Sequence, residues 1–178
     1  LSLKNGRIVC EALDKLKKEG LVKKIGVSIY DPNELNKIFD YMLPDVVQAP
    51  FNIFDQRILT SGWLKRLKYN SIEIQIRSIF LQGLLLFDQS ELPKKFEKWK
   101  NHFENWFNFV NKSEYSTLEI LVNSVLSIKE VDKFIVGVQN ASQLKSIIDV
   151  YKNPKPLSIN MFQTEDEQLI NPSKWSEF

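Results

Sequence analysis

The chain has 178 residues, 43% of them hydrophobic and 26% charged, which is typical of a globular protein and unlike a disordered chain. The formal net charge of +2 is too small for a dedicated nucleic-acid binder, and no run of about 18 apolar residues is present to span a membrane. One cysteine and one histidine exclude an internal disulfide, a cysteine-built zinc site and a His-pair metal motif. We therefore expect no metal, no nucleic acid and no membrane as partners.

The first half of the chain predicts helices and strands in alternation. The amphipathic stretch 8–19 is a predicted helix that ends at Gly20, and 25–29 is a short buried strand. Asp31-Pro32-Asn33-Glu34 predicts a helix start with Asp31 as the N-cap. A second strand is predicted over 45–49.

The second half continues this alternation. The predicted elements are a helix at 63–68, a strand at 72–78, a long connection at 84–93, helices at 96–110 and 116–128, a strand at 134–138 and a helix at 140–151. In the helix at 96–110 the aromatic residues recur at helical spacing, which favours core packing over a base-stacking surface. The last helix is predicted to face inward through Leu144, Ile147, Ile148 and Tyr151.

Strand–helix alternation of this kind favours an α/β fold with parallel strands and right-handed crossovers. Neither a Gly-x-Gly-x-x-Gly motif nor a Walker loop is present, which disfavours a Rossmann or P-loop protein. The pattern alone leaves two architectures open, a small doubly wound sheet or part of a (β/α)₈ barrel. Ligands bind at the C-terminal ends of the strands in both.

Each predicted strand delivers one polar residue to that rim: Ser28, Gln48, Arg77 and Gln139. These groups are suited to holding a polar ligand rather than to acid–base chemistry, and the alternative is that they satisfy backbone amides. At the last junction, Gly137 allows a close backbone approach or a positive φ. Asn140, with Gln143 three residues later, predicts a helix N-terminus, which favours phosphate; an ordinary capped helix is the alternative.

Four segments in this order resemble those of the aldo/keto reductases. The segment 19–28 resembles the family's lysine-rich Gly-Val-Ser stretch, and 47–52 with Arg57 resembles its Val-Gln-x-x-Tyr-Asn stretch. The segment 77–85 resembles the strand that cradles the nicotinamide nucleotide, and 137–144 resembles the adenosine-phosphate segment. The resemblance implies the C-terminal half of a (β/α)₈ TIM barrel, strands five to eight. It also implies a partial barrel domain over 1–156, with 157–178 as the tail of the same domain.

The resemblance further implies a cytoplasmic oxidoreductase that transfers hydride between NADP (NADPH), or alternatively NAD, and a small-molecule aldehyde or ketone. Ser28 and Gln48 would hydrogen-bond the nicotinamide carboxamide. Arg77 stands where the family usually has an aromatic ring that stacks on the nicotinamide, and a guanidinium plane can also stack. The remaining implied cofactor residues are Ser78, Phe80 and Gln82 along the pyrophosphate, and Gly137, Gln139 and Gln143 at the adenosine end.

The family's catalytic Asp, Tyr, Lys and His lie on earlier strands. Because the chain also opens with Leu1 rather than Met, we expect an N-terminally truncated fragment with no catalytic residue and no activity alone. We expect His102 and Tyr30 to serve in packing. A half-barrel would expose Val27, Val47 and Ile76 and would dimerise or aggregate. The alternative function is a non-catalytic NADP-binding regulatory or partner-binding protein on the same barrel.

Overall fold

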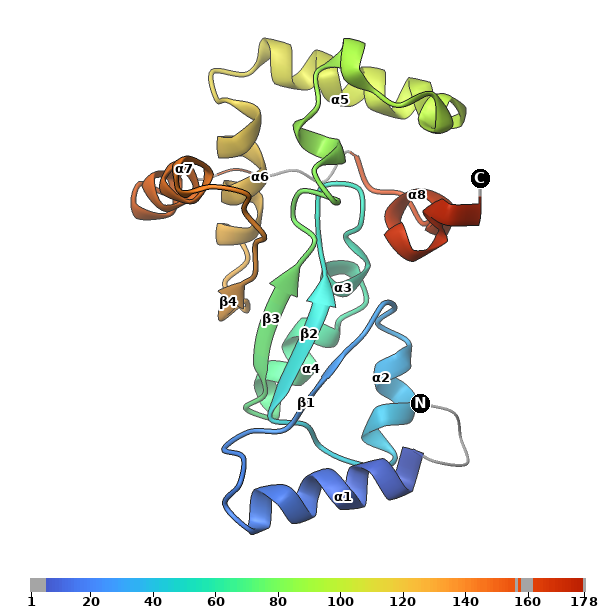
Figure 1. The fold of residues 1–178 in the computed structure, drawn as a ribbon, viewed down its shortest axis with the longest axis vertical. Helices are drawn as coiled ribbons and strands as arrows, with labels where there is room; N and C mark the ends of the chain where they lie inside the picture. The colour runs from blue at the N-terminus through green and yellow to red at the C-terminus, as the bar shows by residue number, and fades with distance from the viewer. Residues whose placement is uncertain (1–5, 156, 158–161, 178) are drawn as a thin grey trace.

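The computed structural model describes residues 6–155, 157 and 162–177, which form a four-stranded parallel sheet with helices packed against one face and at its ends (Figure 1). The strands lie in chain order: β1 (Gly26–Ser28), β2 (Val46–Pro50), β3 (Glu73–Arg77) and β4 (Lys133–Phe134). All three pairings are parallel, as the alternation of strands and helices predicts. The predicted length of the fourth strand is wrong, because its pairing with β3 ends where Ile135 N–H donates to Ile76 O at 2.7 Å.

The α-helices are α1 (Gly6–Lys18), α2 (Glu34–Phe39), α3 (Arg57–Thr60), α4 (Trp63–Tyr69), α5 (Lys100–Lys112), α6 (Thr117–Leu126), α7 (Ala141–Lys152) and α8 (Glu167–Ile170). The 3₁₀ helices are η1 (Leu84–Leu86), η2 (Gln89–Glu91), η3 (Lys94–Trp99) and η4 (Pro172–Glu177). Among the described residues, no helix is both long and apolar enough to cross a membrane.

Local signals place most helix ends correctly. Gly20 follows α1 with φ +73°, and the capping box of α6 forms because Ser116 and Glu119 accept each other's backbone N–H. The hydrogen bonds predicted between Asp31 and Glu34 form, since the Asp31 carboxylate accepts the N–H of Asn33 and the Glu34 carboxylate accepts the N–H of Asp31. The predicted helix start is wrong, because α2 begins only at Glu34, with Asn33 as its N-cap. The predicted helix at 96–110 opens as the 3₁₀ helix η3 and becomes an α-helix only at Lys100.

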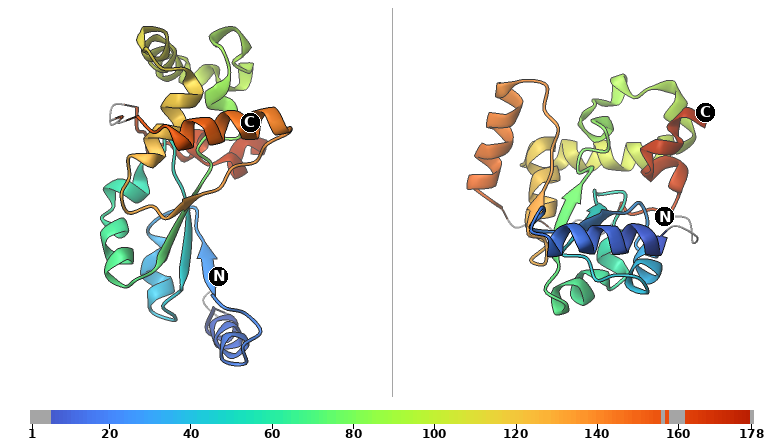
Figure 2. Two further views of the ribbon diagram at one scale, coloured as in Figure 1. Left: turned by 90° about the vertical axis from the view of Figure 1, so that its left-hand side faces the viewer. Right: turned by 60° about the horizontal axis from the view of Figure 1, so that its bottom comes forward.

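One face of the sheet is apolar and covered by helices. Val47 and Ala49 of β2, with Ile74 and Ile76 of β3, are 0% exposed. They pack in one core cluster with residues of α2, α4, α6 and α7, and α2, α3 and α4 lie together on one side of the strands (Figure 2, left). The expectation that Val47 and Ile76 are exposed is wrong, because strand alternation turns them toward the helices.

The helix α7 meets this core through a narrow contact. Ile147 is 6% exposed, but Leu144, Ile148 and Tyr151 are 42%, 38% and 57% exposed. The predicted inward face of four residues is therefore wrong for three of them. The reason is the short β4, which leaves little sheet for α7 to cover.

A second core cluster lies beyond the C-terminal ends of the strands. It is rich in aromatic residues, which include Phe54, Phe96, Phe103, Trp106 and Phe162. The tail joins it where Thr164 N–H donates to Phe54 O at 2.9 Å. The aromatic stripe at 96–110 therefore serves in packing, as predicted.

Candidate functional site

The C-terminal ends of three adjacent strands bring together Ser28, Gln48 and Arg77. The register pairs Ser28 with Gln48 and Pro50 with Arg77, and strand alternation puts all of them on the face opposite the apolar core. The Ser28 hydroxyl donates to Gln48 Oε1 at 3.4 Å. The sheet thus assembles these three predicted site residues at one rim.

Arg77 reaches back over the rim toward β1. Its Nη2 donates to Ile29 O at 2.9 Å, and its Nη1 donates to Ser78 Oγ at 3.2 Å. Its Cζ lies 4.7 Å from the centre of the Tyr30 ring, and Tyr30 is 49% exposed. Tyr30 therefore belongs to the rim, although the sequence predicted a packing role for it. Its position two residues after the end of β1 at Ser28 is the sequence signal that could have placed it there.

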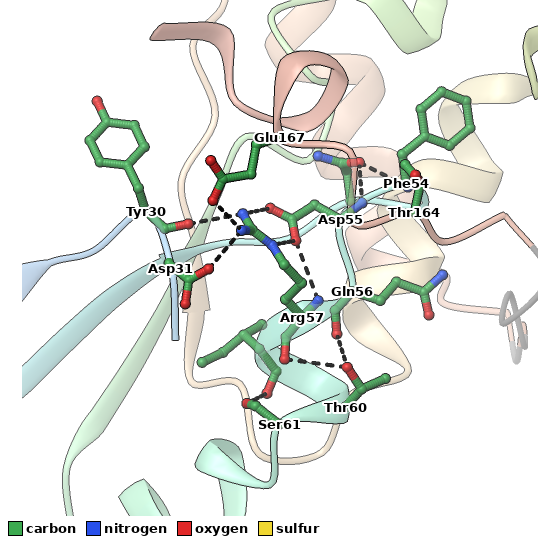
Figure 3. Close-up of polar contacts among 12 residues, drawn as sticks. Tyr30, Asp31, Phe54, Asp55, Gln56, Arg57, Thr60, Ser61, Thr164 and Glu167 are labelled. Carbon is green, nitrogen blue, oxygen red and sulfur yellow. Dashed lines mark hydrogen bonds and ion pairs between the residues drawn. The ribbon is translucent and has the colours of Figure 1, made fainter. Parts of the chain in front are cut away.

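The loop that carries Tyr30 is fixed by Arg57 (Figure 3). Arg57 donates to Tyr30 O at 3.0 Å, to Asp31 Oδ2 at 2.9 Å and to both carboxylate oxygens of Asp55. Glu167 of α8 lies 3.6 Å away. Burial alone would lower the pKa of Arg57, but the hydrogen bond and charge of Asp55, with the charges of Asp31 and Glu167, raise the pKa above its ordinary value. The guanidinium thus joins the β1–α2 loop, the β2–α3 loop and the tail.

The turn after β3 has an unusual backbone. Ser78, Leu81 and Gln82 have φ values of 64°, 46° and 55°, which residues other than glycine rarely adopt, and Gly83 follows with 86°. Asn52 stabilises this turn, since its Nδ2 donates to Ser78 O at 3.2 Å. The N–H groups of Leu81, Gly83 and Leu84 donate to carbonyls within the turn, which is therefore closed by its own hydrogen bonds.

The predicted pyrophosphate residues differ in their exposure. Gln82 is exposed in this turn, whereas Phe80 is half-buried and packs against both core clusters. Ser78 joins the rim through its bond from Arg77.

The junction before α7 is a self-contained cap. Asn140 Oδ1 accepts Gln143 N–H at 2.9 Å, and Gln143 Oε1 accepts Gln139 N–H at 2.8 Å. Gly137, Gln139 and Gln143 are all exposed. The expectation of a positive φ at Gly137 is wrong, because its φ is not positive. An added Cβ would meet nothing within 4 Å, so no described part of the chain packs closely on this glycine.

His102 lies in the aromatic core and not at the rim. Its ring meets Phe54 edge to face at a centroid distance of 4.4 Å, and its Nε2 is buried without a hydrogen-bond partner among the described residues. Burial lowers the pKa of His102, and a hydrogen bond with the Phe162 backbone opposes this shift in part. Within residues 6–155, 157 and 162–177, no three His, Cys, Asp or Glu side chains group to hold a metal ion.

Comparison with known proteins finds one family. A sequence model of the Aldo/keto reductase family matches residues 7–169. An NADH-specific methylglyoxal reductase from Escherichia coli is 33% identical over 73 residues, which are 41% of this chain and 22% of that protein. The chain also resembles solved structures in fold. The holo form of the aldo-keto reductase AKR11C1 from Bacillus halodurans matches with a TM-score of 0.66 and 18% identity, over 86% of this chain and 53% of that one.

A thermostable aldo-keto reductase in complex with the inhibitor epalrestat matches with a TM-score of 0.58 and 18% identity, over 84% of this chain and 49% of that one. The chain therefore spans about half the length of these solved structures and 22% of the curated relative.

Proposed function

Because the chain belongs to the aldo/keto reductase family, we propose that it is the cofactor-holding half of an NAD(P)H-dependent oxidoreductase acting on an aldehyde or ketone. The observation that carries this proposal is the row of Ser28, Gln48 and Arg77 across the ends of three adjacent parallel strands. In this proposal the four strands are the fifth to eighth of the family's barrel. Residues 1–156 are then a partial barrel domain and 157–178 its tail; the boundary at 156 lies outside the described residues.

The side chains at the rim fit a nicotinamide carboxamide. A carboxamide both donates and accepts hydrogen bonds, and the Ser28 hydroxyl and the Gln48 amide offer both functions. The nicotinamide, when bound, supplies or accepts the hydride. Ser28 and Gln48 fix the orientation of its carboxamide, and hence which face of the ring meets the substrate.

The turn after β3 and the start of α7 would hold the rest of the cofactor. Ser78, Phe80 and Gln82 would line the pyrophosphate in this proposal, and all three lie in the turn that follows β3. Gly137, Gln139 and Gln143 would hold the adenosine end, where the positive end of the α7 dipole favours a phosphate. We propose NADPH as the cofactor. NADH is the alternative, favoured by the Escherichia coli relative, whose name specifies NADH.

No residue of this chain acts as the proton donor in this proposal. Apart from the phenol of Tyr30, whose ring stacks on Arg77, the polar side chains at the rim are an alcohol, an amide and a guanidinium, none of which exchanges protons readily near neutral pH. His102 is held in the aromatic core. We therefore expect no carbonyl reduction by the purified chain, and measurable turnover would contradict this assignment.

A second candidate function is a nucleotide-binding regulatory protein without catalysis. Arg77, at a position where the family usually has an aromatic ring, favours it. The two candidates differ in whether Asp, Tyr, Lys and His occur on the other strands of the whole protein. Both require that the rim binds the cofactor.

Titration of the purified chain with NADPH, followed by nicotinamide fluorescence, tests the cofactor site. Gln48→Ala removes the amide and is expected to weaken binding roughly tenfold, the value of one good hydrogen bond. Gln89→Ala, an exposed glutamine of η2, is the matched control and should leave the affinity unchanged. Equal affinities of wild type and Gln48→Ala would refute the assignment of Gln48.

A further inference from the structure

The guanidinium of Arg77 spans the rim directly beyond the Ser28–Gln48 pair. Arg77 is the last residue of β3, yet its Nη2 bonds to Ile29 O at the end of β1, so the side chain crosses the end of β2. It lies on the same face of the sheet as Ser28 and Gln48. A flat ring whose amide group is held by that pair therefore meets the Arg77 guanidinium.

Tyr30 keeps this guanidinium in place. The ring centre lies 4.7 Å from Arg77 Cζ, which is the geometry of a cation–π contact. The backbone of Tyr30 is itself fixed at both ends, because its N–H donates to Glu34 at 2.7 Å and its carbonyl accepts from Arg57 at 3.0 Å. The stack leaves Arg77 little freedom to swing away from the rim.

The charge of Arg77 is not compensated by an acid. Its two hydrogen-bond partners are a carbonyl and a hydroxyl oxygen, and in the described part of the chain no carboxylate lies within ion-pair distance of it. Arg57, which donates to Tyr30 O at 3.0 Å, differs from Arg77 by having three acidic partners. A positive charge without a counter-ion thus lies at the place where the proposed function puts the nicotinamide.

The two redox forms of a nicotinamide differ in charge at this ring. The oxidised ring is a pyridinium with a positive charge, whereas the reduced dihydropyridine is neutral. A fixed guanidinium beside the ring repels the positively charged pyridinium, whereas it stacks on the neutral dihydropyridine without charge repulsion. Resting on the proposed function, we propose that Arg77, held by Tyr30, makes this site select the reduced cofactor over the oxidised one.

The test compares NADPH with NADP⁺, which differ only at the ring. Both are titrated calorimetrically against the purified chain at one ionic strength, because salt screens charge repulsion. The wild type should bind NADPH roughly tenfold more tightly, and Arg77→Gln should bring the ratio close to one, chiefly by tightening NADP⁺. Arg77→Lys keeps the charge and should keep the preference, which separates charge from any loss of folding.

The matched control is Arg66→Gln, since Arg66 also stacks on an aromatic ring, that of Trp63, at 4.3 Å, but from α4 on the opposite face. It should leave the ratio unchanged. Equal weakening of both forms by Arg77→Gln would mean that Arg77 contacts a phosphate, and the inference would be overturned. If NADPH binds and Gln48→Ala weakens its binding, but Arg77→Gln leaves the ratio of the NADPH and NADP⁺ affinities unchanged, this inference alone fails. If NADPH does not bind, the proposed function fails with it.

Discussion

Asp55 holds Arg57 at two points, with Nε to Oδ1 at 2.9 Å and Nη2 to Oδ2 at 3.0 Å, and its side chain is only 1% exposed. Because Arg57 also fixes the backbone of Tyr30, this pair orders the loop next to the proposed nicotinamide site. A two-point pair of this kind is more directional than an ordinary surface ion pair.

Asp55→Ala leaves the Arg57 guanidinium without its buried partner. We expect the free energy of unfolding to fall by about 3 kcal/mol, measured by urea denaturation, because the charge stays desolvated. Glu167→Gln is the control: Glu167 lies 3.6 Å from Arg57 and is 45% exposed, so less than about 1 kcal/mol should be lost. Equal losses in the two variants would contradict this ranking.

Asp45 supports the opposite end of the sheet. Its carboxylate pairs with Lys17 at 2.6 Å and accepts the N–H of Ile25 at 2.9 Å, and these bonds lower its pKa. Since the folded pKa lies below the unfolded one, this contribution is complete above about pH 4 and is lost as the pH falls through the folded pKa.

Asp45→Asn should therefore cost about 1 kcal/mol at pH 7 and flatten the loss of stability below about pH 4, followed by unfolding curves at decreasing pH. Asp14→Asn, which removes an exposed ion pair within α1, should alter neither quantity appreciably. If the stability of Asp45→Asn fell at low pH as steeply as that of the wild type, the role given to this carboxylate would be refuted.

Gly26 permits the close approach of β1 and β2. A Cβ at this position would lie 2.6 Å from Val46 O and 3.0 Å from Val46 Cβ. Gly26→Ala should destabilise the chain by about 2 kcal/mol, because the strands must separate. Gly137→Ala, where an added Cβ meets nothing within 4 Å, should change stability by less than about 1 kcal/mol. Thermal unfolding of both variants measures these losses, and a larger loss in Gly137→Ala than in Gly26→Ala would contradict the prediction.

His102 is the single histidine, so its ring protons can be followed without assignment. We expect an NMR titration midpoint below the ordinary value of about 6.5, because burial disfavours the charged ring. Stability should then decline as the pH drops below about 6.5 and level off under the folded pKa. His102→Phe should remove this pH dependence of stability. A titration midpoint at or above 6.5 would disprove that burial disfavours the charged ring of His102.

Signals carried by neighbouring residues predicted the fold well. The Ser116–Glu119 box and the Asn140–Gln143 cap depend on residues three positions apart, and both form as predicted. The contact between Arg77 and Ile29 joins residues 48 positions apart, so no local pattern encodes it. The same reason explains the errors at β4 and at the exposed side of α7, since how far a strand pairs depends on its neighbour in space.

The chain-order arrangement of the sheet has a consequence for folding. The paired residues Gly26 and Val46 are 20 positions apart, Val46 and Glu73 are 27 apart, and Gln75 and Lys133 are 58 apart. Closing the longest of these loops costs about 1 kcal/mol more entropy than closing the shortest. During synthesis β1, β2 and β3 can therefore pair as soon as they emerge, whereas β4 joins last and should exchange its amide hydrogens first.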